Sequence, residues 1–177
     1  MKESPVGATG LAHQGDAVVC DPPHACLGCL ATSGLSMELT KDQVEALFGI
    51  VEVRRLYKGE VLITEGEYDD HLYVVAKSEF EVTRGKTDDT EVELARLCPG
   101  TATGELAFLG GLERTATVTA ADDGACVIAL QSSDLESLLV EHPQLVFKVM
   151  RAILRSAHRT VSKMDASHID MLRYIQS

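Results

Sequence analysis

One arginine stands out in the segment GELAFLGGLERTATV, residues 104–118, because its surroundings are mostly apolar. Arg114 follows the carboxylate of Glu105 by nine residues, across a loop that contains two glycines. A buried charge is costly unless an opposite charge or hydrogen bonds compensate it. Two interpretations follow: either the segment turns at the surface and Arg114 is solvated there, or the arginine is placed to receive an anion.

The residue types around Arg114 indicate what that anion would be. A short helix beginning at Gly104 would direct backbone N–H groups and the positive end of its dipole toward a ligand. The planar guanidinium of Arg114 matches phosphate oxygens. Glu105 repels phosphate, but it can accept hydrogen bonds from a sugar hydroxyl and hold Arg114 in position. The segment therefore predicts a site for one phosphate charge beside a ribose hydroxyl.

The elements that must position these residues are mostly short strands. Between residues 51 and 131, alternating segments are separated by turn signals such as Lys58-Gly59 and Pro99-Gly100. The predicted strands are VEVRRLY, EVLIT, HLYVVAK, EFEVTR, EVELARL, TATVTAA and CVIALQ. This spacing is typical of an antiparallel sandwich or barrel, and the lack of strand–helix–strand alternation disfavours a dinucleotide-binding fold. We therefore expect a mainly β fold with flanking helices.

Helical patterns lie on both sides of the strands. The segment 39–50 is predicted to be a helix, because Thr40 and Gln43 form a capping box at its start. The segment SSDLESLLVEH is predicted to be another, with a serine as N-cap. Pro143 suits the start of a third helix, and nothing interrupts that helix before about residue 175.

This last helix carries residues at steps of four and three, which is a heptad-like pattern. The residues of this seam are Val146, Met150, Ile153, Ala157, Thr160, Met164, His168, Met171 and Ile175. At 1.5 Å per residue the helix is roughly 45–50 Å long, more than a small barrel can cover. We expect the chain to form a homodimer through this helix; the alternative is a helix packed on its own domain.

Residues 104–116 resemble the phosphate-binding cassette of the cyclic nucleotide-binding domain family, in the catabolite activator and fumarate–nitrate regulator superfamily. The family pattern is Gly-Glu, Leu-Ala, a variable loop and Arg-Ser/Thr-Ala, and this chain has GELA and RTA. The resemblance continues through YKGEVLITEGEYDDHLYVVAKSEFEV and HPQLVFKVMRAILRSAHR, so it covers about residues 38–175. It implies an antiparallel β-roll or jelly-roll barrel with an N-terminal helix and a long C-terminal dimerisation helix.

The same resemblance implies a role for each matching residue. Glu105 would bind the ribose 2′-hydroxyl, and Arg114 would pair with the cyclic phosphate of cAMP or cGMP. Thr160, on the long helix, falls where family members often place a polar contact to the base. The remaining phosphate contacts would come from backbone groups at Gly104, Leu106, Thr115 and Ala116 and from the Thr115 hydroxyl. That hydroxyl can contact the phosphate of either nucleotide, so the preference between them stays open.

Three departures from the family pattern occur, one of which is Thr103, just before the Gly-Glu pair, where the family often has an aromatic residue. Asp69-Asp70 stands where the family often has Gly-Asp, and Ser78 stands where it often has Gly. Aspartate tolerates a positive φ better than most residues, and serine does so less readily. These changes bear on affinity more than on the fold. The alternative to a nucleotide sensor is a family fold that has lost its ligand and serves as a dimerisation scaffold.

The patterns divide the chain into three parts. Residues 1–37 are expected to form a flexible segment that contains cysteines, because most of it is rich in Gly, Ala and Ser without a period. Residues 38–142 are the predicted β-roll. Residues 143–177 are the predicted long helix.

The N-terminal segment contains a possible metal site in CDPPHACLGC. Cys20, Cys26 and Cys29 are the candidate ligands, with His24 as a fourth. The superfamily includes oxygen sensors that hold an iron–sulfur cluster through N-terminal cysteines, with one further ligand from the barrel; here that would be Cys98 or Cys126. Four interpretations stay open: uncommitted thiols, an iron–sulfur cluster, a zinc site and a redox disulfide. The second would make the protein a redox or oxygen sensor.

Composition narrows the class of partner. The net charge of −11 argues against broad binding to nucleic acid or to anionic membranes. The sequence stops after the long helix, where family transcription factors continue into a helix-turn-helix, so we expect no direct DNA binding and an unknown protein partner. No apolar run is long enough for a membrane span or a signal peptide, so we expect a cytoplasmic protein. No nucleophile elbow or P-loop occurs, and we expect no enzymatic activity.

Overall fold

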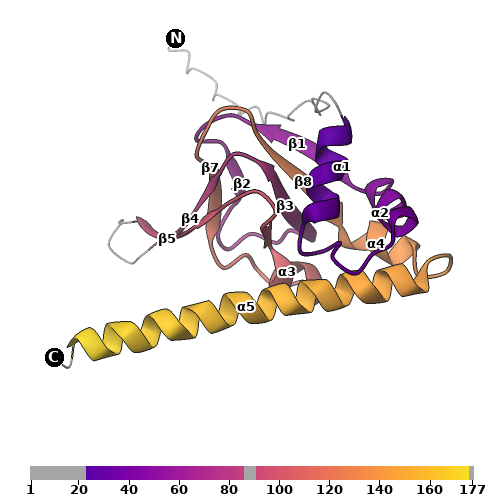
Figure 1. The fold of residues 1–177 in the computed structure, drawn as a ribbon. Helices are drawn as coiled ribbons and strands as arrows, with labels where there is room; N and C mark the ends of the chain where they lie inside the picture. Colours follow the sequence, from indigo (N-terminus) through magenta and orange to yellow (C-terminus); the bar gives the residue numbers. More distant parts are fainter. Residues whose placement is uncertain (1–22, 86–90, 176–177) are drawn as a thin grey trace, which may run out of the picture.

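The computed structural model describes the backbone of residues 23–85 and 91–175 and the side chains of residues 26–85 and 92–162. Its helices are α1 (Pro23–Thr32), α2 (Lys41–Phe48), α3 (Glu105–Gly110), α4 (Ser132–Ser137) and α5 (Pro143–Ile175). Its strands are β1 (Glu52–Leu56), β2 (Val61–Ile63), β3 (His71–Lys77), β4 (Phe80–Gly85), β5 (Glu91–Leu97), β6 (Ala102–Thr103), β7 (Thr117–Ala120) and β8 (Ala125–Gln131). Figure 1 shows α5 running along one side of the strands, with α3 directly above it.

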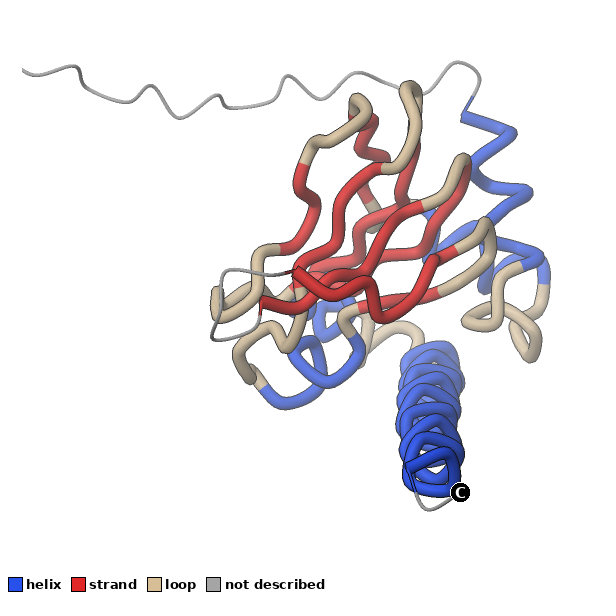
Figure 2. Tube along the Cα trace, turned by 90° about the vertical axis from the view of Figure 1, so that its left-hand side faces the viewer, coloured by secondary structure: helices blue, strands red, loops and turns tan. Residues whose placement is uncertain are grey.

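The strands form two four-stranded antiparallel sheets (Figure 2). One has the order β1-β8-β3-β6 and the other the order β2-β7-β4-β5. All seven strands predicted from the sequence are present, so the expectation of an antiparallel β-roll with flanking helices is confirmed. The chain crosses between the sheets after β1, β2, β3, β5, β6 and β7, which buries one face of each sheet against the other.

Strands β3 and β8 lie at the centre of the fold and are buried on both faces. Alternate residues of β8 face different layers: Ile128 packs toward the helices and Val127 toward the second sheet. In β3, Val74 and Val75 are divided in the same way. Successive strand residues point to opposite faces, so burial on both faces requires an apolar residue at nearly every position. This explains the continuous apolar runs of HLYVVAK and ACVIALQ.

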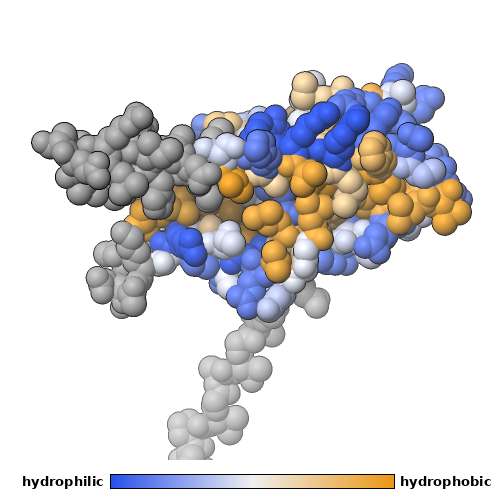
Figure 3. Space-filling view, turned by 90° about the horizontal axis from the view of Figure 1, so that it is seen from below, coloured by the Kyte–Doolittle hydropathy of each residue, from blue (hydrophilic) through white to orange (hydrophobic). Residues whose placement is uncertain are grey.

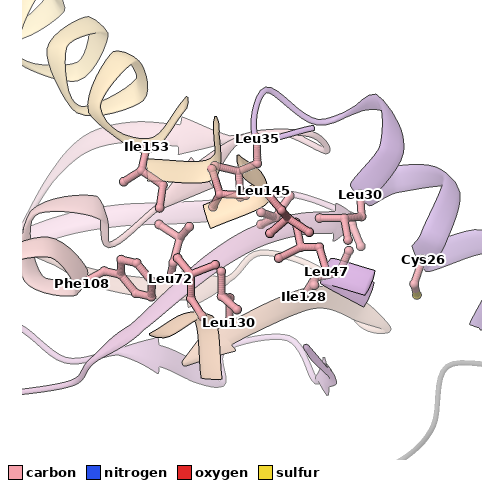
Figure 4. Packing of buried hydrophobic residues seen from close by; sticks show 14 of the residues in the cluster. Cys26, Leu30, Leu35, Leu47, Leu72, Phe108, Ile128, Leu130, Leu145 and Ile153 are labelled. Carbon is pink, nitrogen blue, oxygen red and sulfur yellow. The ribbon is translucent and has the colours of Figure 1, made fainter. Parts of the chain in front are cut away.

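Helix α5 packs its first turns against the helical layer of the core. Leu145, Val149 and Ile153 are spaced by four residues, lie on one face and are fully buried. Figure 4 shows Leu145 and Ile153 meeting side chains of the first sheet, of α3 and of the N-terminal helices. This packing fixes α5 beside α3, which begins at the candidate site residue Glu105.

Near the N-terminus the structure differs from the expectation of a flexible segment up to residue 37. Pro23–Thr32 forms α1, whose Cys26 and Leu30 are buried in the core, and Leu35 beyond it is buried too. The sequence PHACLGCLAT has apolar residues on all sides and therefore lacks the period that would indicate an amphipathic helix. Residues 1–22 lie outside the described part of the chain.

Other local predictions have mixed outcomes. The capping box of Thr40 and Gln43 is formed at the start of α2. Helix α4 is capped by Gln131 and not by a serine, and it ends at Ser137, five residues before the predicted end. The two-residue strand β6 is too short to leave an alternating pattern and was not predicted. The serine at position 78 has a φ of 64°, so this turn does require the left-handed conformation that the family meets with glycine.

The seam predicted on α5 is only partly correct. Its members Val146, Ile153 and Ala157 are buried against their own domain, which is the alternative that the sequence left open. Another apolar row of the same helix faces solvent and contains Phe147, Leu154 and Val161. Figure 3 shows apolar side chains gathered on this underside of the molecule. Among the described helices, none is long and apolar enough to cross a membrane.

Candidate functional site

The predicted short helix at residue 104 is present as α3, and Gly104 is its N-cap. Gly104 has a φ of 89°, which side chains of L-residues rarely allow. A Cβ at this position would also collide with Nη1 of Arg114. Both the backbone conformation and the close approach of the arginine therefore require glycine at the start of the cassette.

Arg114 is buried, with 4% of the residue exposed. Its Nη1 donates to the carbonyl of Gly104 at 3.1 Å. Its Nη2 donates to Oδ2 of Asp69 at 2.7 Å and to the carbonyl of His71 at 2.6 Å. Its Nε is buried and has no hydrogen-bond partner among the described residues. The interpretation of a merely solvated arginine is therefore wrong, and the Nε–H of the guanidinium is left without a partner among the described residues.

Asp69 holds Arg114 through a network of hydrogen bonds at the start of β3. Its carboxylate accepts hydrogen bonds from the Tyr73 hydroxyl at 2.9 Å and from Nδ1 of His71 at 2.6 Å. Arg54 can only donate, so its contact of 3.2 Å with Nε2 of His71 makes that nitrogen the acceptor and leaves the proton on Nδ1. The network joins residues of two strands, β1 and β3, and fixes the arginine from the β-roll side.

This network shifts the pKa values of Asp69 and Tyr73. Burial raises the pKa of Asp69, but the hydrogen bonds from His71, Arg114 and Tyr73 and the charge of Arg114 outweigh it and hold the pKa well below the usual aspartate range. Burial and the nearby charge of Asp69 raise the pKa of Tyr73 to about 12. At neutral pH Asp69 is therefore an anion paired with Arg114, and Tyr73 is a neutral donor.

Glu105 is also buried, with 7% of the residue exposed. Its Oε1 accepts a hydrogen bond of 2.7 Å from the hydroxyl of Ser156, which lies on α5. The sequence interpretation that Glu105 holds Arg114 in position is not what the structure shows, because Asp69 has that role. The prediction missed both Asp69 and Ser156, although Asp69 lies in the segment EGEYDD that carried part of the resemblance.

The other predicted contact residues lie around these two charges. Leu106 and Thr115 are exposed, and Ala116 is half-buried. Thr160 is exposed, and its hydroxyl donates to the carbonyl of Ser156, 3.2 Å away. A cavity of about 350 Å³ opens beside Ser156, Thr160 and Arg159 of α5 and extends to the turns near residues 34 and 101. Glu105 and Arg114 do not line it.

The cysteines give no further support for a metal site. Cys26 is buried in the core, and the thiol of Cys29 donates to the carbonyl of Ala76 at 3.3 Å. Cys20 lies outside the described residues, so the three-cysteine site stays a prediction. Within the described residues, the one group of three possible ligands is Asp69, Asp70 and His71, and Arg114 already forms an ion pair with Asp69 of this group.

The site therefore combines a buried cation, a buried anion and a glycine N-cap between them. The cation has an unused Nε–H, and the anion is bonded to one hydroxyl group. An uncharged alcohol is the natural partner of the carboxylate, and an anion is the natural partner of the guanidinium. The arrangement suits a ligand that carries both groups close together.

The chain matches a known family profile and several solved structures. The profile described as cyclic nucleotide-binding domain matches residues 53–142, just over half of the chain. The N-terminal domain of a transcriptional regulator from Streptomyces coelicolor A3(2) is 30% identical, with a TM-score of 0.67, and the match covers 77% of this chain and 94% of that one. The catabolite activator protein of Thermus thermophilus is 28% identical, with a TM-score of 0.67, over 80% of this chain and 63% of that one.

Curated proteins with similar segments are mostly much longer. A cGMP-dependent protein kinase of Caenorhabditis briggsae is 39% identical over 87 residues, which is 49% of this chain and 11% of the kinase. The chain spans no more than 28% of the length of the curated relatives that it matches first. The similarity therefore concerns one domain of those proteins.

Proposed function

The chain belongs to the cyclic nucleotide-binding domain family, and on that premise we propose that it is a sensor for cAMP or cGMP that signals through α5. The cyclic phosphate would take the unused Nε–H of Arg114, and the ribose 2′-hydroxyl would bind Glu105. Backbone groups at the start of α3 and after Arg114, with the Thr115 hydroxyl, would complete the phosphate site. The observation that carries this proposal is the buried Arg114, which retains an unpartnered donor beside a buried carboxylate.

Helix α5 supplies the route by which binding would be reported. Its residue Ser156 contacts Glu105, and Thr160 lies one turn further along the same helix, beside the cavity. A base directed toward Thr160 would meet its hydroxyl group. Binding at Glu105 would then shift the position of α5 relative to the β-roll, which is a change between two pre-existing states.

The proposal is tested by calorimetric titration of the purified protein with cAMP and, separately, with cGMP. We expect saturable binding of at least one nucleotide, and a loss of about a hundredfold or more in affinity for Arg114→Ala, because a charged hydrogen-bond partner of the phosphate is removed. Arg96→Ala is the matched control, since Arg96 is an exposed arginine of β5 that forms ion pairs with Glu81 and Glu93. Unchanged affinity in Arg114→Ala would contradict the assigned site.

We also propose that two copies pair through the exposed row of α5. Phe147, Leu154 and Val161 are seven residues apart, and Met150 lies between the first two at the spacing of a heptad. The partner of such a row is a second helix of the same pattern, which favours another copy of this chain. Sedimentation should give a dimer that Leu154→Glu dissociates. Val140→Glu changes an apolar residue that is 91% exposed outside α5, and it should leave the dimer intact.

A further inference from the structure

The carboxylate expected to bind ribose is already engaged by a side chain of α5. Ser156 donates to Oε1 of Glu105 at 2.7 Å, across 51 positions of the sequence. Within the described part of the chain, this is the one side-chain hydrogen bond of Glu105. The carboxylate is buried, so without this hydroxyl group it would have neither a protein partner nor full access to water.

The hydroxyl of serine and the 2′-hydroxyl of ribose are the same chemical group. Each is an uncharged alcohol that donates one hydrogen bond to a carboxylate oxygen. Ser156 already donates to Oε1 and only 7% of Glu105 is exposed, so a ribose hydroxyl that approaches this oxygen would compete with Ser156. Replacing the serine hydroxyl by the ribose hydroxyl on Glu105 changes the free energy of this hydrogen bond little. The concentration of the ligand therefore determines which of the two hydroxyl groups is bound.

We propose that Ser156 is a latch: its hydroxyl substitutes for the ribose 2′-hydroxyl on Glu105, and cyclic nucleotide binding displaces it and releases α5 at this point. The inference rests on the proposed function and names the contact through which that site is coupled to the helix. Ser156 is thus a positioning residue for α5 and a competitor of the ligand.

The surroundings of Ser156 allow the exchange. The side chain is half-buried and borders the cavity of about 350 Å³, which gives a displaced hydroxyl group room to turn away from Glu105. The hydrogen bonds of Arg114, by contrast, go to Gly104, Asp69 and His71, and none reaches α5 in the described residues. The contact at Glu105 is therefore the place where ligand binding would reach the helix.

The latch predicts an unusual effect of removing a hydrogen bond. In Ser156→Ala, the buried carboxylate loses its partner in the free protein, whereas the ribose hydroxyl still satisfies it in the bound protein. We therefore expect the variant to bind cAMP about tenfold more tightly than the wild type does. The analogue 2′-deoxy-cAMP brings no hydroxyl to Glu105, so its affinity should not increase.

The experiment is a calorimetric comparison of cAMP with 2′-deoxy-cAMP, and in parallel of cGMP with 2′-deoxy-cGMP, on wild type and Ser156→Ala. The preference for the nucleotide that has the 2′-hydroxyl should rise about tenfold in the variant. Ser156→Thr keeps a hydroxyl and should restore the wild-type preference. Ser137→Ala is the control, because it removes a serine hydroxyl that donates to the backbone carbonyl of Asp134 in α4.

The possible outcomes distinguish the latch of Ser156 from nucleotide binding itself. The latch is wrong if the wild type binds nucleotide but Ser156→Ala shows an unchanged preference for the 2′-hydroxyl or a lower affinity for cAMP. That result leaves the proposed function intact. Wild type that binds neither cAMP nor cGMP overturns both. If Ser156→Ala binds cAMP more tightly but melts at a lower temperature, the latch is still supported when Ser156→Thr has the wild-type preference. That variant keeps the hydroxyl group, so it separates the loss of the hydroxyl from a general loss of stability.

Discussion

The two buried charges of the site are held by different parts of the molecule. Arg114 is bonded to groups that belong to the β-roll and to the cassette itself, and the network behind Asp69 reaches two strands, β1 and β3. Glu105 is bonded to a single hydroxyl group of α5. One charge is therefore fixed by the scaffold, and the other is linked to a helix that packs on the scaffold by one face.

This difference suggests a division of labour within the site. The hydrogen bonds of Arg114 hold its guanidinium in one position, so in the proposed function the arginine half supplies affinity for the phosphate. A carboxylate whose partner is exchangeable couples binding to a neighbouring element, so the glutamate half supplies the signal. A protein with both charges fixed by the β-roll would bind equally well but would have no contact through which to move α5.

The largest effect is expected from Gly104→Ala. Gly104 precedes Glu105 and accepts a hydrogen bond from Arg114, so the substitution affects both charges of the site. The new Cβ would be forced against Arg114 in a backbone conformation that alanine disfavours. We expect nucleotide affinity to fall at least a hundredfold and the free energy of unfolding to fall by about 2 kcal/mol or more. Calorimetry and urea unfolding measure the two effects.

Gly59→Ala is the matched control for that substitution. Gly59 has a φ of 80°, and a Cβ there meets nothing within 4 Å. It should therefore show the conformational cost of about 1 kcal/mol without a loss of affinity. Equal losses of affinity in the two variants would mean that the close approach of Arg114 to Gly104 has no importance for binding.

A smaller effect, on the pH dependence of stability, is expected from Asp69→Asn. This substitution weakens the contact of Asp69 with Arg114 and leaves the contact of Glu105 with Ser156 in place. The pKa of Asp69 is lower in the folded protein than in the unfolded chain. Its contribution to stability is therefore complete above the unfolded aspartate pKa of about 4 and is lost as the pH falls below that value. The urea midpoint of the wild type should drop between pH 6 and pH 3 more steeply than that of Asp69→Asn.

The exposed Asp122 provides the comparison for this pH effect, since it takes part in none of the ion pairs found among the described residues. Asp122→Asn should leave the pH dependence as it is in the wild type. Parallel pH curves for the wild type and Asp69→Asn would contradict the pairing of Asp69 with Arg114. In that case the scaffold would not hold the arginine through this carboxylate.

The smallest effect is expected from Ser78→Gly, which changes the β-roll at the end of β3 opposite to His71. Ser78 is the one non-glycine residue with a positive φ in the described chain. Glycine should raise the free energy of unfolding by about 1 kcal/mol and leave nucleotide affinity unchanged. A change in affinity would show that the stability of the roll and the state of the site are not separable.

Much of the fold could be predicted from the sequence because local patterns determine it. Alternation and turn residues marked seven strands, and the absence of helix breakers after Pro143 marked α5. Helix α1 and strand β6 were missed because an apolar run without a period and a pair of residues carry no such pattern. In each case long-range packing, and not local sequence, determines the element.

The site, too, could be predicted from the sequence only in part. Glu105 and Arg114 could be recognised from their types and spacing, but their partners could not. Asp69 reaches Arg114 across 45 positions and Ser156 reaches Glu105 across 51, through sheet register and the packing of α5. The seam on α5 was only partly correct for a related reason, because a heptad spacing does not say which of two adjacent apolar rows the domain itself will cover.

The most direct test of the account is amide hydrogen exchange with and without saturating cAMP or cGMP, whichever binds. We predict faster exchange in α5 around Ser156 on binding and little change in the central strands β3 and β8, because the helix is released while the scaffold stays fixed. In Ser156→Ala the same segment should exchange rapidly before nucleotide is added. Binding that saturates without any change of exchange in α5 would contradict the claim that this site signals through the helix.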